Sequence, residues 1–187
     1  MIFFYKQRQK KEKILLIGSN LWYLGEGMLG PLFAIFGEKI GGSVLDISWA
    51  WSIYLIVLGV LVIYIGELSD QIGKEKLMIT GFALNAIFTF AYLLISTPLH
   101  LFMVQAGLGV AAAFAMPTWM SLYAKYEDKK RDGYTWGIST GLDRIITGIA
   151  IFIGGIIVTY LSFTVLFLVM GIIQIIATFY QARILKK

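Results

Sequence analysis

The chain has 187 residues, of which 58% are hydrophobic and 14% charged, with no cysteine, one histidine and a net charge of +5. A soluble domain of this length could not bury so much apolar surface in one core, so the composition indicates a membrane protein. The absence of cysteine excludes disulfides and thiolate chemistry. His100 alone cannot build a zinc site or a bis-histidine haem site, so we expect neither a metal nor a cofactor.

Six apolar stretches are each long enough to cross a bilayer as a helix, which takes about 20 residues. In chain order, the predicted spans are residues 14–36, 48–65, 77–96, 99–123, 135–160 and 163–183. Thr97-Pro98 divides the third span from the fourth, because proline lacks an N–H and disfavours helix before it. Tyr160-Leu161-Ser162 divides the fifth from the sixth. The sequence therefore predicts an all-α, polytopic domain over residues 1–187.

The orientation follows from lysine and arginine, which gather in alternate connections between the spans. The basic residues that share one side are Lys6, Arg8, Lys10, Lys11, Lys13, Lys74, Lys76, Lys125, Lys129, Lys130, Arg131, Arg183, Lys186 and Lys187. The other side has Lys39. The positive-inside rule then predicts a multi-pass protein of the plasma (inner) membrane with both termini, the basic segment 1–13 and the basic loop 124–134 in the cytoplasm. Basic residues at membrane boundaries need no nucleic-acid partner, and none is expected.

Two spans sort their residues into a polar or small face and an apolar face. On the first span, Asn20, Tyr23 and Glu26 share a face, opposite large aliphatic residues. The stretch is too long for a signal peptide, so we expect it to stay in the mature protein. On the fifth span, one face is rich in glycine, and its predicted helix-packing residues are Gly137, Gly141, Gly148 and Gly155. Small residues let helix backbones approach closely in lipid.

Glu26 and Arg144 are the two charges whose depth in the bilayer is costly, so each is expected to face protein or water. Glu26 is a candidate proton or cation site, and Arg144 a candidate anchor for an anionic group or a modulator of Glu26. An interhelical ion pair, or a neutral Glu26 bonded to a neighbour, would also explain them. Trp119 is the tryptophan expected to stack on a solute, whereas Trp136 is expected to anchor an interface.

The connection between the second and third spans carries a recognisable motif, over residues 66–76. It reads Gly66-Glu67-Leu68-Ser69-Asp70-Gln71-Ile72-Gly73-Lys74-Glu75-Lys76. This resembles the signature loop of the major facilitator superfamily, with matches at Gly66, Leu68, Asp70, Gly73 and Lys74 and departures at Ser69, Gln71 and Glu75. Glycines there would permit a tight turn, and Asp70 could interact with a helix N-terminus. The resemblance implies a gate loop that helps to hold the cytoplasmic side shut.

Two further stretches, residues 105–117 and 117–155, are similar to the family's fourth-span and fifth-span patterns. Met103 stands where the family has an arginine, and Ala150-Ile151 where its antiporters have Gly-Pro, so exchange transport is not supported. The fold implied is one half of a major-facilitator-type bundle, in which parallel six-span halves bind substrate between them near the midplane. A second six-span half, as a homodimer or a different chain, is the implied partner.

The leading interpretation is therefore a half-size transporter, not an enzyme. It would move a small, amphiphilic or hydrophobic solute by alternating access as a dimer of halves, coupled to protons through Glu26. The cavity residues are predicted to be Asn20, Tyr23, Glu26, Trp119 and Arg144. The alternative is a non-transporting membrane interaction or assembly protein derived from a transporter half. An intramembrane Ser–His protease is not expected, because it would need a buried histidine and His100 is predicted to lie at the external edge. A channel is not expected either, because the sequence has no potassium-type selectivity filter.

Overall fold

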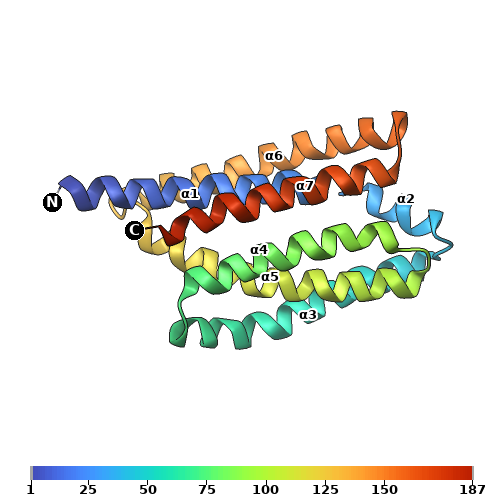
Figure 1. Ribbon diagram of the computed structural model, residues 1–187, viewed down its shortest axis with the longest axis horizontal. Coiled ribbons are helices and arrows are strands. Elements are labelled where there is room, and N and C mark those ends of the chain that lie inside the picture. The colour runs from blue at the N-terminus through green and yellow to red at the C-terminus, as the bar shows by residue number, and fades with distance from the viewer. Residues whose placement is uncertain (1, 187) are drawn as a thin grey trace.

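The computed structural model describes the backbone of residues 2–186 and the side chains of residues 9–186. Over that range the chain forms a bundle of long helices that lie side by side (Figure 1). The helices are α1 (Ile2–Gly27), α2 (Leu32–Lys39), α3 (Val44–Gln71), α4 (Lys74–Ala91), α5 (Pro98–Tyr126), α6 (Asp132–Tyr160) and α7 (Phe163–Ala182), with the short 3-10 helices η1 (Tyr92–Leu94) and η2 (Arg183–Leu185). We call the end where α1 begins and α7 ends the terminal end, and the end where α2 meets α3 the far end.

Five helices of the described chain are long and apolar enough to span a membrane: α3, α4 with η1, α5, α6, and α7 with η2. They correspond to the predicted second to sixth spans. Both predicted divisions are confirmed, and each has a helix cap. The Thr97 side chain accepts from the backbone N–H of His100, and that of Ser162 accepts from Val165, which satisfies N–H groups at the starts of α5 and α7.

The first predicted span is not one continuous helix. α1 ends at Gly27 and α2 begins at Leu32, so the expectation of a single helix over residues 14–36 is wrong. Pro31 cannot donate a backbone hydrogen bond to the preceding turn, and Gly30 has a φ of 24°, which favours glycine. Met28 and Leu29, within the break, are buried. α2 then carries the chain to the far end (Figure 1).

The helices differ in how much of their surface the rest of the chain covers. α5 packs along α3 and α4, α7 along α4 and α1, and α6 along α1. Gly81 allows the backbones of α4 and α5 to approach closely, since a Cβ there would lie 2.5 Å from the backbone N of Ala115. Of the apolar stretch of α5, 56% is buried, against 11% for α3 and 11% for α6. α3 and α6 are therefore the helices that the chain leaves most open.

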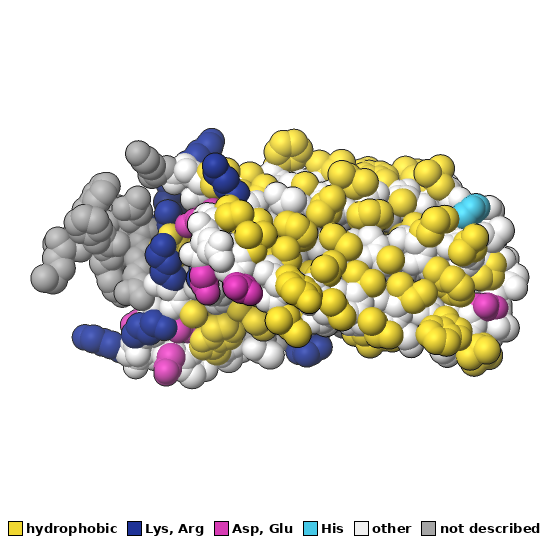
Figure 2. Space-filling model, turned by 90° about the horizontal axis from the view of Figure 1, so that it is seen from below, with side chains coloured by type: hydrophobic (Ala, Val, Ile, Leu, Met, Phe, Trp, Pro, Cys, Tyr) yellow, Lys and Arg dark blue, Asp and Glu magenta, His cyan; other side chains and the backbone are white. Residues whose placement is uncertain are grey.

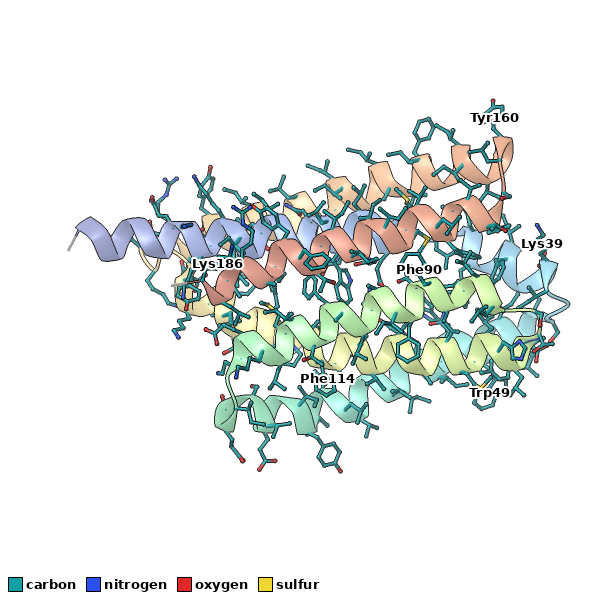
Figure 3. The ribbon with its side chains drawn as sticks, viewed as in Figure 1. Lys39, Trp49, Phe90, Phe114, Tyr160 and Lys186 are labelled. Atoms are coloured by element: carbon teal, nitrogen blue, oxygen red, sulfur yellow. The ribbon has the colours of Figure 1, made fainter. Side chains whose placement is uncertain are left out.

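Charged and apolar surface side chains are separated along the long axis of the bundle. Charged side chains gather near the terminal end, and apolar side chains cover most of the rest of the face in Figure 2. Lys39, Trp49 and Tyr160 lie at the far end, and Lys186 lies at the terminal end (Figure 3). An apolar band between polar ends is what a bilayer requires.

The predicted packing glycines of α6 make no close helix contact within the described chain. Around Gly137, Gly141, Gly148 and Gly155, a Cβ would meet nothing within 4 Å outside its own helix. Close packing falls instead at Gly154, where a Cβ would collide with the carbonyl of Met28 in the turn after α1. The role of the four open glycines against a second bundle stays a prediction.

Candidate functional site

A cavity of about 450 Å³ lies between α1, α3, α5 and α6, with Phe82 of α4 in its wall. Aromatic and methionine side chains form a large part of the wall, through Trp22, Tyr23, Tyr54, Phe82, Met116, Trp119, Met120 and Trp136. Three charged residues complete it: Glu26 from α1, and Asp143 and Arg144 from α6. A largely apolar wall with a few convergent polar groups is typical of a small-molecule site.

The structure brings four of the five predicted cavity residues together. Tyr23, Glu26, Trp119 and Arg144 all line this cavity, from α1, α5 and α6. Asn20 does not. It lines a separate pocket of about 280 Å³ among aliphatic side chains of α1 and α6. The helical periodicity of the sequence predicted that Asn20 and Tyr23 share a cavity. In the structure α6 packs against α1, and the two side chains line different pockets.

The charges of the cavity are not neutralised by direct pairing. Neither Glu26 nor Arg144 forms a salt bridge with a described residue, so the expected alternative of an interhelical ion pair finds no support. The Glu26 carboxyl faces the side chains of Asn85 and Trp22 instead. Asp143 lines the same cavity as Arg144, and its Oδ1 is buried without a hydrogen-bond partner among the described residues. The wall therefore presents both signs of charge.

Trp119 is fixed in place by its neighbours. Its Nε1 donates to the carbonyl of Leu15 at 3.1 Å, and its ring stacks on Tyr123 with centroids 4.8 Å apart. Trp136 meets both rings edge-on. The Tyr123 hydroxyl donates to the carbonyl of Thr135 at 3.0 Å. This aromatic cluster joins α1, α5 and α6 at the side of the cavity toward the terminal end. Trp136, which was expected to anchor the membrane interface, is part of this cluster.

The predicted gate loop, residues 66–76, contains the expected tight turn, but most of the loop is helical. α3 continues through Gly66, Leu68 and Asp70 to Gln71, and only Ile72 and Gly73 separate it from α4. Gly66 is helical and Gly73 has a φ of −58°, so this short turn forms without a backbone conformation reserved for glycine.

Lys74 links the predicted gate loop to α5. Its Nζ lies 2.9 Å from Asp70 Oδ1 and donates to the Ser121 hydroxyl at 2.7 Å. Asp70 thus pairs with the side chain of the first residue of α4. Three helix ends, of α3, α4 and α5, are held together at the terminal end. The gating role of these residues stays a prediction.

Sequence reasoning missed several residues of the site. Tyr54, Met116 and Met120 line the cavity, and Asn85 faces Glu26 from α4. An isolated amide in an apolar span is a usable signal, because buried polar groups in a membrane need partners. The remaining residues carry no such signal, since aromatic and Met side chains are common throughout the spans.

Comparisons with known proteins agree with this architecture. The model of the Major Facilitator Superfamily matches residues 15–186. An MFS-type transporter of Methanocaldococcus jannaschii is 28% identical over 90% of this chain and 44% of its own length. The quinolone resistance protein NorB of Staphylococcus aureus is 26% identical over 89% of this chain and 36% of its own length. The chain thus spans less than half the length of these relatives. It belongs to the major facilitator superfamily, a family of multi-pass membrane transporters and not of enzymes.

Proposed function

We propose that the chain forms one half of a transporter that moves a small solute by alternating access, with the cavity of Glu26, Asp143 and Arg144 as the solute site. The observation that carries the proposal is the position of this cavity. Its walls come from α3 and α6, the two least buried spans, as well as from α1 and α5. A second bundle placed against α3 and α6 would complete the enclosure around the solute.

The second bundle would be another six-span half, with a second copy of this chain as the first candidate. A parallel two-fold dimer would reproduce the symmetric halves of the family with one kind of subunit. The open glycines of α6 would let the partner's backbone approach closely. A different half, or the rest of a longer chain, would meet the same surfaces.

The solute would be an aromatic amphiphile. Trp22, Trp119 and Trp136 offer ring faces and edges, and Glu26 and Asp143 would attract a basic group. The relative described as a quinolone resistance protein makes a quinolone, which is aromatic, the first probe to try. Glu26 would bind the proton whose gradient drives transport.

Both termini would face the cytoplasm of the cell membrane, because the described basic residues outside the cavity lie mostly at the terminal end (Figure 2). Reporter fusions to each terminus should then report the same, cytoplasmic, compartment. Reporters that place the two ends on opposite sides would contradict this topology.

The direct test measures uptake of a fluorescent quinolone into liposomes that contain the purified chain, with and without an imposed pH gradient. The expected result is gradient-dependent uptake, which Glu26→Gln lowers at least about tenfold, equivalent to about 1.4 kcal/mol of barrier. Glu38→Gln is the control, since it removes an exposed carboxylate of α2 outside the cavity. Wild-type uptake equal to that of empty liposomes would contradict transport by this chain, and would favour the alternative of an interaction protein.

A further inference from the structure

Arg144 places a permanent positive charge in the apolar part of the bundle. It lies near the middle of α6, its side chain is exposed, and it lines the cavity of about 450 Å³. A guanidinium stays protonated in proteins, and no described carboxylate forms a salt bridge with this one. A charge at this depth of a membrane is costly unless a partner or water meets it. Arg144 is therefore available to an anionic partner from outside the described chain.

Asp143, the preceding residue, adds a negative group to the same cavity. One of its carboxyl oxygens, Oδ1, is buried and has no hydrogen-bond partner among the described residues. Consecutive residues of a helix point about 100° apart, because one turn takes about 3.6 residues. Asp143 and Arg144 accordingly form no salt bridge with each other. The two side chains can therefore meet different groups of one solute.

Helix packing sets Asp143 at the level of Tyr23, and both residues line the cavity. α1 and α6 pack against each other and run in the same direction (Figure 1). A Cβ on Gly27 of α1 would lie 3.2 Å from the Cα of Thr147 of α6. Tyr23 and Asp143 come four residues before these two, so they share one level. Glu26, three residues after Tyr23, lies about 4.5 Å further toward the far end.

The cavity is aromatic on the side of these charges that faces the terminal end. Trp136 lines the cavity eight residues before Arg144 on α6, which is about 12 Å toward the terminal end. Trp119 of α5 meets Trp136 edge-on, with ring centroids 6.5 Å apart. A solute that fills this space would meet tryptophan rings at one end and the two charges of α6 toward the other.

The balance of charge in the wall depends on the form of Glu26. With Glu26 ionised, two negative side chains line the cavity and one positive side chain opposes them. When Glu26 carries a proton, as the proposed function requires, Asp143 and Arg144 remain and their charges cancel. A solute that is only a cation would then leave Arg144 unpaired in an apolar band. A solute with one charge of each sign would pair with both side chains.

We propose that the cavity is selective for aromatic zwitterions, with Arg144 binding the carboxylate of the solute and Asp143 binding its basic group. Arg144 suits this part because its planar guanidinium can donate two parallel hydrogen bonds to a carboxylate. The inference deepens the proposed function and rests on it for the location of the solute site. It adds an anionic group to the solute and makes Arg144 the residue that selects for that group.

The test compares three forms of one quinolone: the parent compound with a free carboxyl and a free secondary amine, its ethyl ester, and its N-acetyl derivative. Equilibrium dialysis against the purified full chain in lipid nanodiscs measures each dissociation constant, and empty nanodiscs correct for binding to lipid. We expect the ester and the N-acetyl derivative to bind at least about tenfold more weakly than the parent compound, because each has lost one charge that the wall would pair.

Variants of the two charged residues should separate the two contacts. Arg144→Gln should weaken binding of the parent compound about tenfold and leave the ester unchanged, because the ester has no carboxylate to lose. Asp143→Asn should weaken the parent compound and leave the N-acetyl derivative unchanged. Arg131→Gln is the matched control. It removes another exposed arginine, at the start of α6 and outside this cavity, and should change none of the three constants.

Equal binding of the parent compound and the ester to the wild-type chain would overturn the proposal, as would no binding of the parent compound. An Arg144→Gln variant that weakens both compounds alike would also overturn it, since that result is expected if Arg144 pairs with a carboxylate of the second bundle. If Arg144→Gln does not insert, Arg144→Lys serves instead, because it keeps the charge and loses the two parallel bonds. It should reduce the preference for the parent compound over the ester, and an unchanged preference would contradict the role of the guanidinium.

Failure of the proposed function is a separate outcome. A chain that prefers the parent compound in this Arg144-dependent way, yet carries none of it into liposomes, would retain the inference and reject the transporter.

Discussion

The glycines of α6 lie on two faces that differ in what they contact. On one face, Gly154 lies against the carbonyl of Met28, and Ala150 lies 3.0 Å from where a Cβ of Gly27 would be. On the other face, Gly137, Gly141 and Gly148 meet nothing within 4 Å outside their own helix. The first face is a completed contact and the second is an available one. Small residues therefore show where another helix can approach closely. Whether a helix of the same chain occupies that position depends on the fold.

The contact between α1 and α7 is intermediate between these two kinds of glycine environment. Gly18 and Gly25, seven residues apart, leave room for Gln181 and Gln174, which are also seven residues apart on the antiparallel helix. The space beside each glycine is filled by the flexible end of a side chain, not by backbone. Substitutions at the three kinds of glycine should consequently differ in cost.

Gly154→Ala should have the largest effect on stability. The added methyl would meet the backbone of Met28, which cannot move without displacing the turn between α1 and α2, and overpacking of this kind costs about 1–3 kcal/mol. The midpoint of thermal unfolding in detergent, followed by tryptophan fluorescence, should fall clearly. Gly155→Ala, one residue further, is the matched control, because its methyl would point into open space. Equal midpoints for the two variants would contradict the packing described for α6.

Gly25→Ala should have a smaller cost, because the end of Gln174 can move away from the new methyl. The two positions should also be coupled, since contacting residues show interaction energies of about 0.5–3 kcal/mol. The same unfolding midpoint should fall less when Gly25→Ala is introduced into a Gln174→Ala background than into the wild type. Additive effects in the double variant would show that Gln174 does not pack against Gly25.

Gly148→Ala should have the smallest effect on the isolated chain. No neighbour is disturbed, and alanine is favoured over glycine in a helix by up to about 1 kcal/mol, so the midpoint should stay the same or rise slightly. The dimer should nevertheless weaken if this face meets a second bundle, which sedimentation in detergent can measure. A lower midpoint with an unchanged dimer would assign Gly148 to the interior of the chain.

The sequence predicted the fold better than it predicted the site. Thr97-Pro98 identified the start of α5 because the effect of proline is local, and Tyr160-Leu161-Ser162 located the turn before α7. Pro31 carried an equally local signal, but the apolar residues on both sides favoured one long span. Tyr23 and Glu26 lie three residues apart on one helix, so their common face followed from periodicity.

The meeting of Glu26 with Trp119 and Arg144 depends on which helices are neighbours, and periodicity within one helix does not contain that information. Asn20 illustrates the same limit, since the packing of α6 separates it from Tyr23. Asn85 was visible as a polar residue in an apolar span, yet only the fold brings it near Glu26.

The central claim is that the open side of the bundle faces a second bundle across the cavity, and cross-linking in the bilayer tests it most directly. The chain has no native cysteine, so Arg144→Cys introduces a unique thiol in the cavity wall, and Ile87→Cys introduces one on the exposed outer side of α4. A short bis-maleimide should convert Arg144→Cys into a covalent dimer and leave Ile87→Cys monomeric. A monomeric Arg144→Cys, or a dimer formed equally well through Ile87→Cys, would contradict two copies facing each other across a shared cavity.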